Sequence, residues 1–287
     1  MTTSDGTREA VKTANSPDGT TIVAGYLAGE ASETQRARRP DQKQPRPEAD
    51  HMASGTGHAS TAASETFLRA RRPEQKQQRR EGILAAAREL ALLGGVRSVS
   101  LAGIAARAGI DKSALLRYFE TREQIFLELT AREWAPWLRA LHDGLDGVVA
   151  GSRDAADQVA DVVARSFGDR PLFCDLLAHA PLNLERNVSP EAVRGYKLIS
   201  LGAVGEAADV VHRTLPDLTE QECREFIAAI ASLAGNLWQI ANPVPALAAM
   251  FAADPDLALA CVDLVPRLHR TAEILLAGLI PSRRRPA

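Results

Sequence analysis

Lys112, Ser113, Arg117 and Tyr118 place four hydrogen-bonding side chains within seven residues of the chain. Ammonium, hydroxyl and guanidinium groups are donors that proteins use to contact the phosphates and base edges of DNA. Such contacts require a helix that presents these side chains on its exposed face, as in a helix that enters the major groove. The residue types therefore predict DNA-binding chemistry, provided that the neighbouring segments form such a helix.

The segment over residues 98–119 has the pattern of two short amphipathic helices joined at Gly109. Ser100 is a suitable N-cap for the first helix and Asp111 for the second, and glycine permits the tight turn between them. In the second helix Leu115 and Phe119 are spaced i, i+4 and point inward. The first helix has one apolar face, formed by Leu101, Ile104, Ala105 and Ala108. The outward set is Lys112, Ser113, Leu116, Arg117 and Tyr118. The pattern predicts a helix-turn-helix.

Charge is distributed unevenly along the chain. Residues 67–130, the head, carry 12 Lys and Arg against 7 Asp and Glu, whereas residues 131–287 carry 15 against 20. A basic head on an acidic body fits a phosphate-binding module joined to a domain with another purpose. Chance segregation of solvated surface charge is the alternative if only charge is considered.

Helical patterns flank the helix-turn-helix, and we expect an all-α fold. Ala, Leu, Glu and Arg dominate after residue 80, and 45% of the chain is apolar, which is enough for a core. A first helix is predicted over about Glu74–Leu93, ending at Gly94-Gly95. Another opens at Thr121, with Gln124 completing a capping box, and continues toward Trp134. The link between head and body is therefore expected to be helical.

The N-terminal tail, residues 1–66, is rich in small and polar residues and lacks a spaced apolar pattern, so we expect it to be disordered. It contains a partial repeat, since residues 36–49 match residues 69–82 at 10 of 14 positions. Only the second copy runs into a predicted helix, because two prolines prevent helix continuation in the first. The sequence leaves open whether residues 1–51 belong to the functional protein. Residues 281–287 are expected to form a basic C-terminal tail.

The body, residues 131–280, shows further helical segments. They are broken at Gly151, 169–171, 181–190, Pro216 and 242–255. The strongest apolar segments are Glu220–Ala241 and Asp256–Leu279, and Pro266 either kinks the second or marks its start. Two apolar helices at a chain end could form a four-helix interface across a two-fold axis, with a core inside one chain as the alternative. The candidate dimerisation residues are Phe226, Ile230, Leu233, Leu237, Leu264, Leu268 and Leu275.

Several classes of protein have no support in the sequence. Residues 226–253 carry no charge, but glycine, asparagine and proline interrupt them before they reach the length of a membrane span. No secretory signal is visible, and we expect a cytoplasmic protein. The three cysteines are widely spaced and form no CxxC, which favours buried thiols over a disulfide scaffold or a metal site. Catalytic and cofactor motifs are lacking, so we expect neither an enzyme nor a cofactor.

The order of a basic arm, a long first helix, a Gly-Gly stop and the helix-turn-helix closely resembles the TetR family of transcriptional regulators. The resemblance is strong over residues 75–129 and most specific over residues 104–119 with Arg122-Glu123 after them. Beyond residue 130 it covers only size and helix pattern. It implies an all-α homodimer that binds a palindromic DNA operator and is released by a small ligand held in the C-terminal domain.

The resemblance also implies roles for individual residues. Ser100 and Arg122, at helix N-termini, would contact phosphates, and Lys112, Ser113 and Arg117 would reach base edges. Further contacts would come from Ala114, Leu116 and Tyr118, with Arg69, Arg71, Arg72, Lys76, Arg79 and Arg80 following the backbone or entering the minor groove. Two residues depart from the family pattern. Leu116 stands where a tyrosine is usual and could contact a thymine methyl group, and Asp111 places a carboxylate near phosphates but also caps its helix.

For the body, the resemblance implies a ligand cavity and an unidentified small-molecule effector. The candidate lining residues are Trp134, Trp137, His142, Phe167, Phe173, Cys174, His179 and Trp238. Ordinary core positions are the alternative for the aromatic residues. The prediction as a whole is a ligand-responsive repressor that binds double-stranded DNA as a homodimer. The alternative is a helical ligand-binding or protein-interaction module that has no specific DNA function.

Overall fold

The computed structural model describes residues 58–280, apart from the side chains of residues 58–73, 258 and 259. Every regular element in that range is helical, which confirms the all-α prediction. In chain order the elements are α1 (His58–Gly94), η1 (Val96–Ser98), α2 (Leu101–Arg107), α3 (Lys112–Leu115), α4 (Arg122–Leu145), α5 (Ala155–Gly168), α6 (Pro171–His179), η2 (Ala180–Leu184), α7 (Pro190–Thr214), α8 (Glu220–Ala241), α9 (Pro245–Ala253), η3 (Pro255–Ala260) and α10 (Leu264–Leu279). The predicted tail and repeat over residues 1–57 and the basic segment 281–287 lie outside the described residues.

The first helix is longer than predicted. α1 begins at His58 and not near Glu74, so residues 58–66 are helical and the prediction that they belong to a disordered tail is wrong. The segment before Pro73 contains Ala, Leu, Glu and Arg, residues that favour a helix even without a regular apolar stripe. The helix continues through Pro73 and ends at Gly94, as the Gly-Gly pair predicted.

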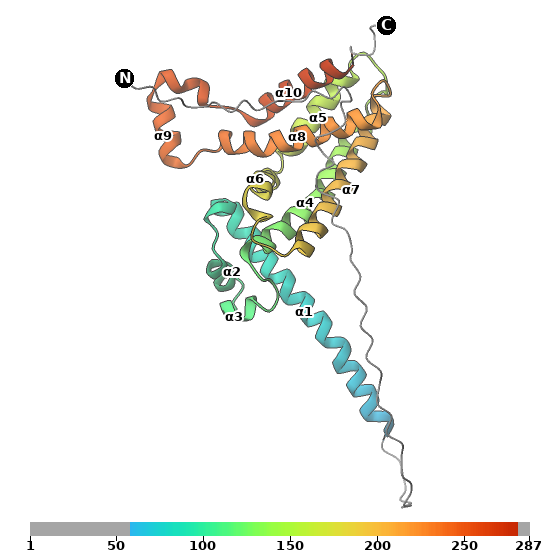
Figure 1. Cartoon of the computed structure of the whole chain (residues 1–287), viewed down its shortest axis with the longest axis vertical. Helices are drawn as coiled ribbons and strands as arrows, with labels where there is room; N and C mark the ends of the chain where they lie inside the picture. The colour runs from blue at the N-terminus through green and yellow to red at the C-terminus, as the bar shows by residue number, and fades with distance from the viewer. Residues whose placement is uncertain (1–57, 281–287) are drawn as a thin grey trace, which may run out of the picture. The chain divides into compact units, whose positions relative to one another are not determined.

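The head is built from α1, η1, α2, α3 and the first turns of α4, which pack around one apolar cluster (Figure 1). Gly109 has a φ of 66°, so the turn after α2 uses the left-handed backbone region that glycine adopts without strain. The cluster includes Ile83, Leu84, Ala87, Val96, Ile104, Leu115, Phe119, Ile125 and Phe126. Leu172 and Leu176 of α6 belong to the same cluster, so the body completes the core of the head.

The body packs the second half of α4 with α5, α7, α8 and α10 around a second apolar cluster. α8 has the bounds predicted from the sequence, and a capping box at Thr219 and Glu222 begins it. Pro266 lies in the first turn of α10, where a missing backbone N–H costs nothing, so it marks the start of this helix. The helix breaks predicted around residues 151, 170 and 216 also lie between helices.

α9 lies in a stretch that the sequence predicted as a break. Pro245 occupies the first helical position, where its fixed φ favours helix initiation. None of the nine residues of α9 is buried, although most of them are apolar. Figure 1 shows α9 beyond the C-terminal end of α8, where it connects α8 to η3 and α10.

Candidate nucleic-acid interface

The recognition segment, residues 111–119, begins with the short helix α3 and continues as a helical turn. Backbone hydrogen bonds such as Phe119 N–H to Leu115 O extend the turn beyond the four residues of α3. Leu115 and Phe119 are completely buried, as their spacing predicted. Lys112, Ser113 and Arg117 are exposed, as is Leu116, while Ala114 and Tyr118 are half-buried. The segment therefore presents one polar and basic face to solvent.

A groove of about 910 Å³ lies between α1 and the recognition segment, and we call it the head groove. Its lining residues are Gln75, Lys76, Gln78, Arg79, Gly82, Ile83, Ala108, Ile110, Arg117 and Tyr118. Three of them are cationic and none is acidic, so the groove attracts anions. Lys76 and Arg79 come from α1 and Arg117 from the recognition segment, which brings together basic residues that lie far apart in the sequence. The side chains of Arg69, Arg71 and Arg72 lie outside the described part of the chain.

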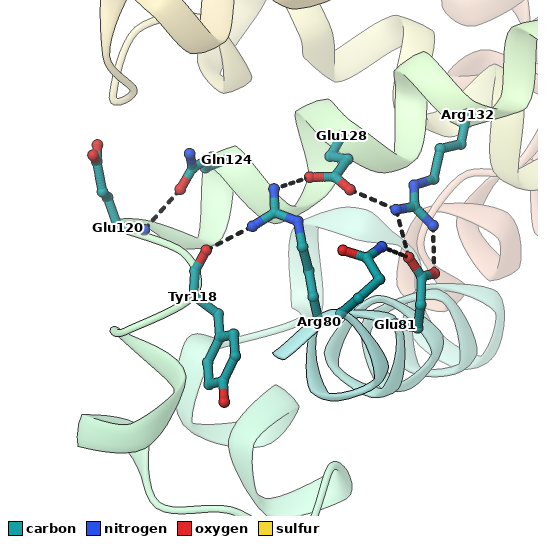
Figure 2. A network of polar contacts seen from close by, with 8 residues as sticks. Arg80, Glu81, Tyr118, Glu120, Gln124, Glu128 and Arg132 are labelled. Atoms are coloured by element: carbon teal, nitrogen blue, oxygen red, sulfur yellow. Dashed lines mark hydrogen bonds and ion pairs between the residues drawn. The ribbon is translucent and has the colours of Figure 1, made fainter. Parts of the chain in front are cut away.

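Arg80 has a different role from the one expected. Its Nη1 donates to the carbonyl oxygen of Tyr118 at 2.8 Å, and its Nη2 pairs with Glu128. The guanidinium lies over the ring of Phe119, 4.1 Å from the ring centroid. Figure 2 shows Arg80 reaching from α1 between Tyr118 and Glu128. Because these partners use the guanidinium inside the head, Arg80 supports the recognition segment from behind and is not a free phosphate ligand.

The same network continues to Arg132, which joins α4 to α1 (Figure 2). Its guanidinium donates to both carboxylate oxygens of Glu81, at 2.5 and 2.9 Å, and to Glu128 at 2.7 Å. The hydrogen bonds from Arg132 hold the pKa of Glu81 below its usual value. This bidentate geometry fixes the direction of the pair more firmly than a single contact would.

Arg122 is likewise used inside the head. Its Nε and Nη2 donate to the carbonyl oxygens of Val99 and Val96, and its Nη1 pairs with Glu123 at 3.1 Å. In the structure the guanidinium satisfies backbone carbonyls in the connection before α2, and its contact with phosphate stays a prediction. At the start of α2, Ser100 Oγ accepts the Gly103 N–H at 3.0 Å, which confirms the predicted N-cap. Its contact with phosphate stays a prediction.

Two other caps differ in detail from the prediction. Asp111 occupies the N-cap position of α3, but its side chain makes no capping hydrogen bond. Thr121 caps α4 as expected by accepting the Gln124 N–H at 3.1 Å. A capping box would require the Gln124 side chain to accept the N–H of Thr121. It instead accepts the N–H of Glu120, one residue earlier, at 2.7 Å (Figure 2).

The aromatic ligand candidates of the body are mostly core residues. Trp137, Phe167 and Phe173 are completely buried and pack against one another, with Trp137 and Phe167 stacked at 4.8 Å between centroids. Trp137 Nε1 donates to Ser166 Oγ at 3.0 Å, so its polar atom is satisfied within the core. Cys174 is also buried, and desolvation raises the pKa of its thiol to about 12. Burial in the core cluster favours the alternative of ordinary packing roles for these four positions.

Trp134 is different, because it is 4% exposed and its indole Nε1 is buried with no hydrogen-bond partner. It also lines a groove of about 410 Å³, which we call the body groove. The other lining residues are Leu177, Ala178, Ala180, Pro181, Leu182, Glu185, Tyr196, Lys197, Ser200, Leu201, Val204, Ala228, Ala231, Ser232 and Asn236. An unsatisfied buried donor beside an open apolar groove distinguishes Trp134 from the other aromatic candidates.

The remaining ligand candidates lie apart from one another. His142 is exposed near Glu206, with 3.9 Å between Nε2 and Oε1. Trp238 is half-buried against the body core. His179 lies 3.4 Å from Asp175, a residue that the sequence did not single out. None of the three lines the body groove.

The predicted dimerisation residues belong mainly to the core of a single chain. Phe226, Ile230, Leu264 and Leu268 are buried in the body cluster, which favours the alternative of intrachain packing for these positions. Leu233, Leu237 and Leu275 are half-buried against the same cluster. The large apolar side chains left exposed at this end of the chain are instead Ile240, Val244, Leu247, Met250 and Ile274.

A helix-turn-helix head joined to an all-α body with its own core defines a DNA-binding regulator of the helix-turn-helix class. Comparison with family models identifies the particular group. Residues 83–129 match bacterial regulatory proteins of the tetR family, and residues 131–283 match the tetracyclin repressor-like C-terminal domain. The chain belongs to the TetR family of transcriptional regulators.

Solved structures of regulators resemble the chain at low sequence identity. FadR from Bacillus subtilis, in complex with stearoyl-CoA, is 17% identical, with 69% of this chain and 98% of that chain covered and a TM-score of 0.45. AmtR from Mycobacterium smegmatis is 20% identical, with 72% of this chain and 96% of that chain covered and a TM-score of 0.37. SmeT, the repressor of a multidrug efflux pump of Stenotrophomonas maltophilia, is 21% identical, with 69% of this chain and 89% of that chain covered and a TM-score of 0.38. No curated protein sequence matches significantly.

Within the described residues, no helix combines the length and apolar character needed to cross a membrane.

Proposed function

We propose that this regulator binds a palindromic operator as a homodimer, with Lys112, Ser113 and Arg117 contacting base edges. The supporting observation is the head groove, where Arg117 lies with Lys76 and Arg79 beside the exposed recognition segment. In a dimer the two recognition segments enter successive major grooves about 34 Å apart. Lys76 and Arg79 contact phosphates in this proposal, and Leu116, which is 45% exposed, contacts a thymine methyl group.

Selection of bound genomic fragments tests this proposal, followed by binding measurements on the selected site and on random DNA. Arg117→Ala is expected to lose about 1–3 kcal/mol on the selected site and less on random DNA. Arg79→Ala is expected to weaken binding to both and to reduce the salt slope by about one. Arg213→Ala, an exposed arginine of the body, is the matched control. Equal losses on both DNAs for Arg117→Ala would contradict the base contact.

For the dimer, we propose that the second copy covers the exposed apolar surface of α9 and the end of α8. Ile240, Val244, Leu247 and Met250 are each 44–58% exposed, and residues 226–253 carry no charge. An uncharged apolar surface of this kind is typical of a homodimer interface. Leu247→Asp is expected to shift the protein toward monomer in sedimentation velocity, because the charge would be buried without a partner. Val149→Asp, a substitution at a residue that is 72% exposed elsewhere, is the control.

We further propose the body groove as the effector site. Its rim residues Leu182 and Leu201 are 63% and 65% exposed, and Trp134 Nε1 lacks an acceptor. A largely apolar molecule with one carbonyl acceptor would cover both leucines and pair with the indole. A 100-fold release from DNA requires about 2.7 kcal/mol of coupling between the two sites. A thermal-shift screen of ketones, esters and amides tests the proposed effector site. Leu201→Arg is expected to abolish the shift in thermal midpoint caused by a bound compound, and Trp134→Phe is expected to weaken it. Unchanged shifts in both variants would place the effector elsewhere.

A further inference from the structure

Three potential metal ligands from two helices meet on the surface of the body, away from both grooves. Asp157 is on α5, and His269 and Glu273 are on α10. One donor atom from each side chain can be chosen so that all three lie within 4.8 Å of one another. α5 and α10 pack closely, as shown by the Gly168 backbone of α5, which lies against Val265 of α10. The backbone therefore holds the three side chains together, although more than one hundred residues separate Asp157 from the other two.

The geometry of the three donors suits a small ion. His269 and Glu273 are spaced i, i+4, which places both on one face of α10. Two donors on a tetrahedral zinc ion, with bonds near 2.0–2.1 Å, are separated by about 3.3 Å. His269 Nε2 and Asp157 Oδ1 are already 3.3 Å apart. Only the Glu273 side chain has to adjust, and at 33% exposure it has room to rotate.

The existing contacts of these residues do not fully satisfy them. His269 Nε2 is buried and makes no hydrogen bond, even though Asp157 is close. Glu273 Oε2 lies 3.4 Å from Arg270 Nη1, but Arg270 is 70% exposed and such surface pairs are weak. A buried imidazole nitrogen that makes no hydrogen bond and lies close to two carboxylates is available to coordinate a cation.

We propose that Asp157, His269 and Glu273 form a binding site for a divalent transition-metal ion, best matched by Zn²⁺. One imidazole and two carboxylates supply three protein ligands, and water completes the tetrahedron. The imidazole disfavours Mg²⁺ and Ca²⁺, which select oxygen ligands. The bound ion ties α10 to α5 and so stabilises the body, independently of DNA and effector binding.

Equilibrium dialysis of the full chain against Zn²⁺ tests the site, in a Cys261→Ser background because Cys261 is an exposed thiol. One Zn²⁺ per chain is expected, with a rise in the thermal midpoint. We expect each of three variants, Asp157→Asn, His269→Gln and Glu273→Gln, to weaken Zn²⁺ binding more than about tenfold. Loss of a residue that only hydrogen-bonds to a metal ligand already lowers metal affinity by about that factor. Circular dichroism without metal checks that these variants remain folded.

His142→Gln is the matched control, because His142 has one acidic neighbour, Glu206, and no second carboxylate within the described residues completes a cluster around it. It is expected to bind Zn²⁺ like the parent. The proposal is overturned if the parent binds no Zn²⁺, if the three variants bind as the parent does, or if His142→Gln loses the ion equally. A visible Co²⁺ spectrum that the His269→Gln variant lacks would identify the imidazole as a direct ligand.

Discussion

Asp175 of α6 is a buried carboxylate that contacts three parts of the fold. Its Oδ2 accepts the Val96 N–H of η1 at 2.7 Å, and its Oδ1 accepts from Gln239 of α8 at 2.7 Å. His179 lies one helical turn away at 3.4 Å. Burial raises the pKa of Asp175, but the hydrogen bonds from His179, Val96 and Gln239 outweigh it and leave the pKa below its ordinary value. The charged form is therefore the one that links the body to the start of the helix-turn-helix.

The lowered pKa makes a prediction for stability in acid. Because the folded-state pKa of Asp175 lies below its unfolded value near 3.8, its contribution is fully present above that value and is lost as the pH falls through the folded-state pKa. Asp175→Asn is expected to cost about 1–3 kcal/mol in free energy of unfolding at pH 7. The difference from the parent should shrink in urea denaturation below about pH 4.

Asp161→Asn is the control for this prediction, because Asp161 forms only an exposed i, i+4 pair with Arg165. Pairs of this kind contribute about 0.3–0.5 kcal/mol. A cost for Asp175→Asn that stays constant from pH 7 to pH 3 would show that the carboxylate charge is not what stabilises the fold.

Among single residues, the sequence predicts position better than partner. The inward Leu115 and Phe119, the outward Arg117 and the cap at Ser100 follow from helical spacing and local hydrogen bonding, which act within four residues. Apart from the adjacent Glu123, which pairs with Arg122, the partners of Arg80 and Arg122 lie 23 to 48 residues away. A basic residue near a DNA-binding segment is equally compatible with a phosphate and with a backbone carbonyl, so only the fold decides between them.

At the scale of elements, Gly109 allows a stability test of the turn between α2 and α3. Its φ of 66° is unfavourable for a residue with a Cβ atom, although no heavy atom lies within 4 Å of the position that a Cβ would take. Gly109→Ala is therefore expected to cost about 1–2 kcal/mol from backbone conformation alone. Gly202, inside α7, also has open space around it but helical geometry. Gly202→Ala is expected to stabilise the protein by up to about 1 kcal/mol.

Urea denaturation of the two glycine variants measures these opposite effects. If both substitutions changed stability in the same direction, the backbone conformation at Gly109 would not be the cause.

The elements that the sequence predicts correctly are those that depend on local signals. The turn at Gly109 and the bounds of α8 follow from local signals, whereas α9 was missed because its prolines and missing stripe are typical of a break. None of its apolar residues is buried within the described part of the chain.

At the scale of the whole molecule, the head and the body share one apolar cluster. Leu172 and Leu176 of α6 pack with the head residues, and Arg88 of α1 pairs with the buried Glu133 of α4. The sequence predicted a helical link at α4 but not this shared core, because contacts between α6 and the head depend on how distant helices pack. Separation into two independently stable parts is not expected, since neither part closes the cluster alone.

We therefore expect the head and the body to unfold together. All three tryptophans, Trp134, Trp137 and Trp238, lie in the body, so their fluorescence reports the body alone. Circular dichroism reports the helices of both parts. At one protein concentration in urea, the two signals should give coincident transitions, as for a single cooperative unit. Leu176→Ala removes a completely buried side chain of the shared cluster and is expected to lower both midpoints together, at a cost of about 2–5 kcal/mol. An early change in circular dichroism without a change in fluorescence would show that the head unfolds alone and that α6 does not couple it to the body.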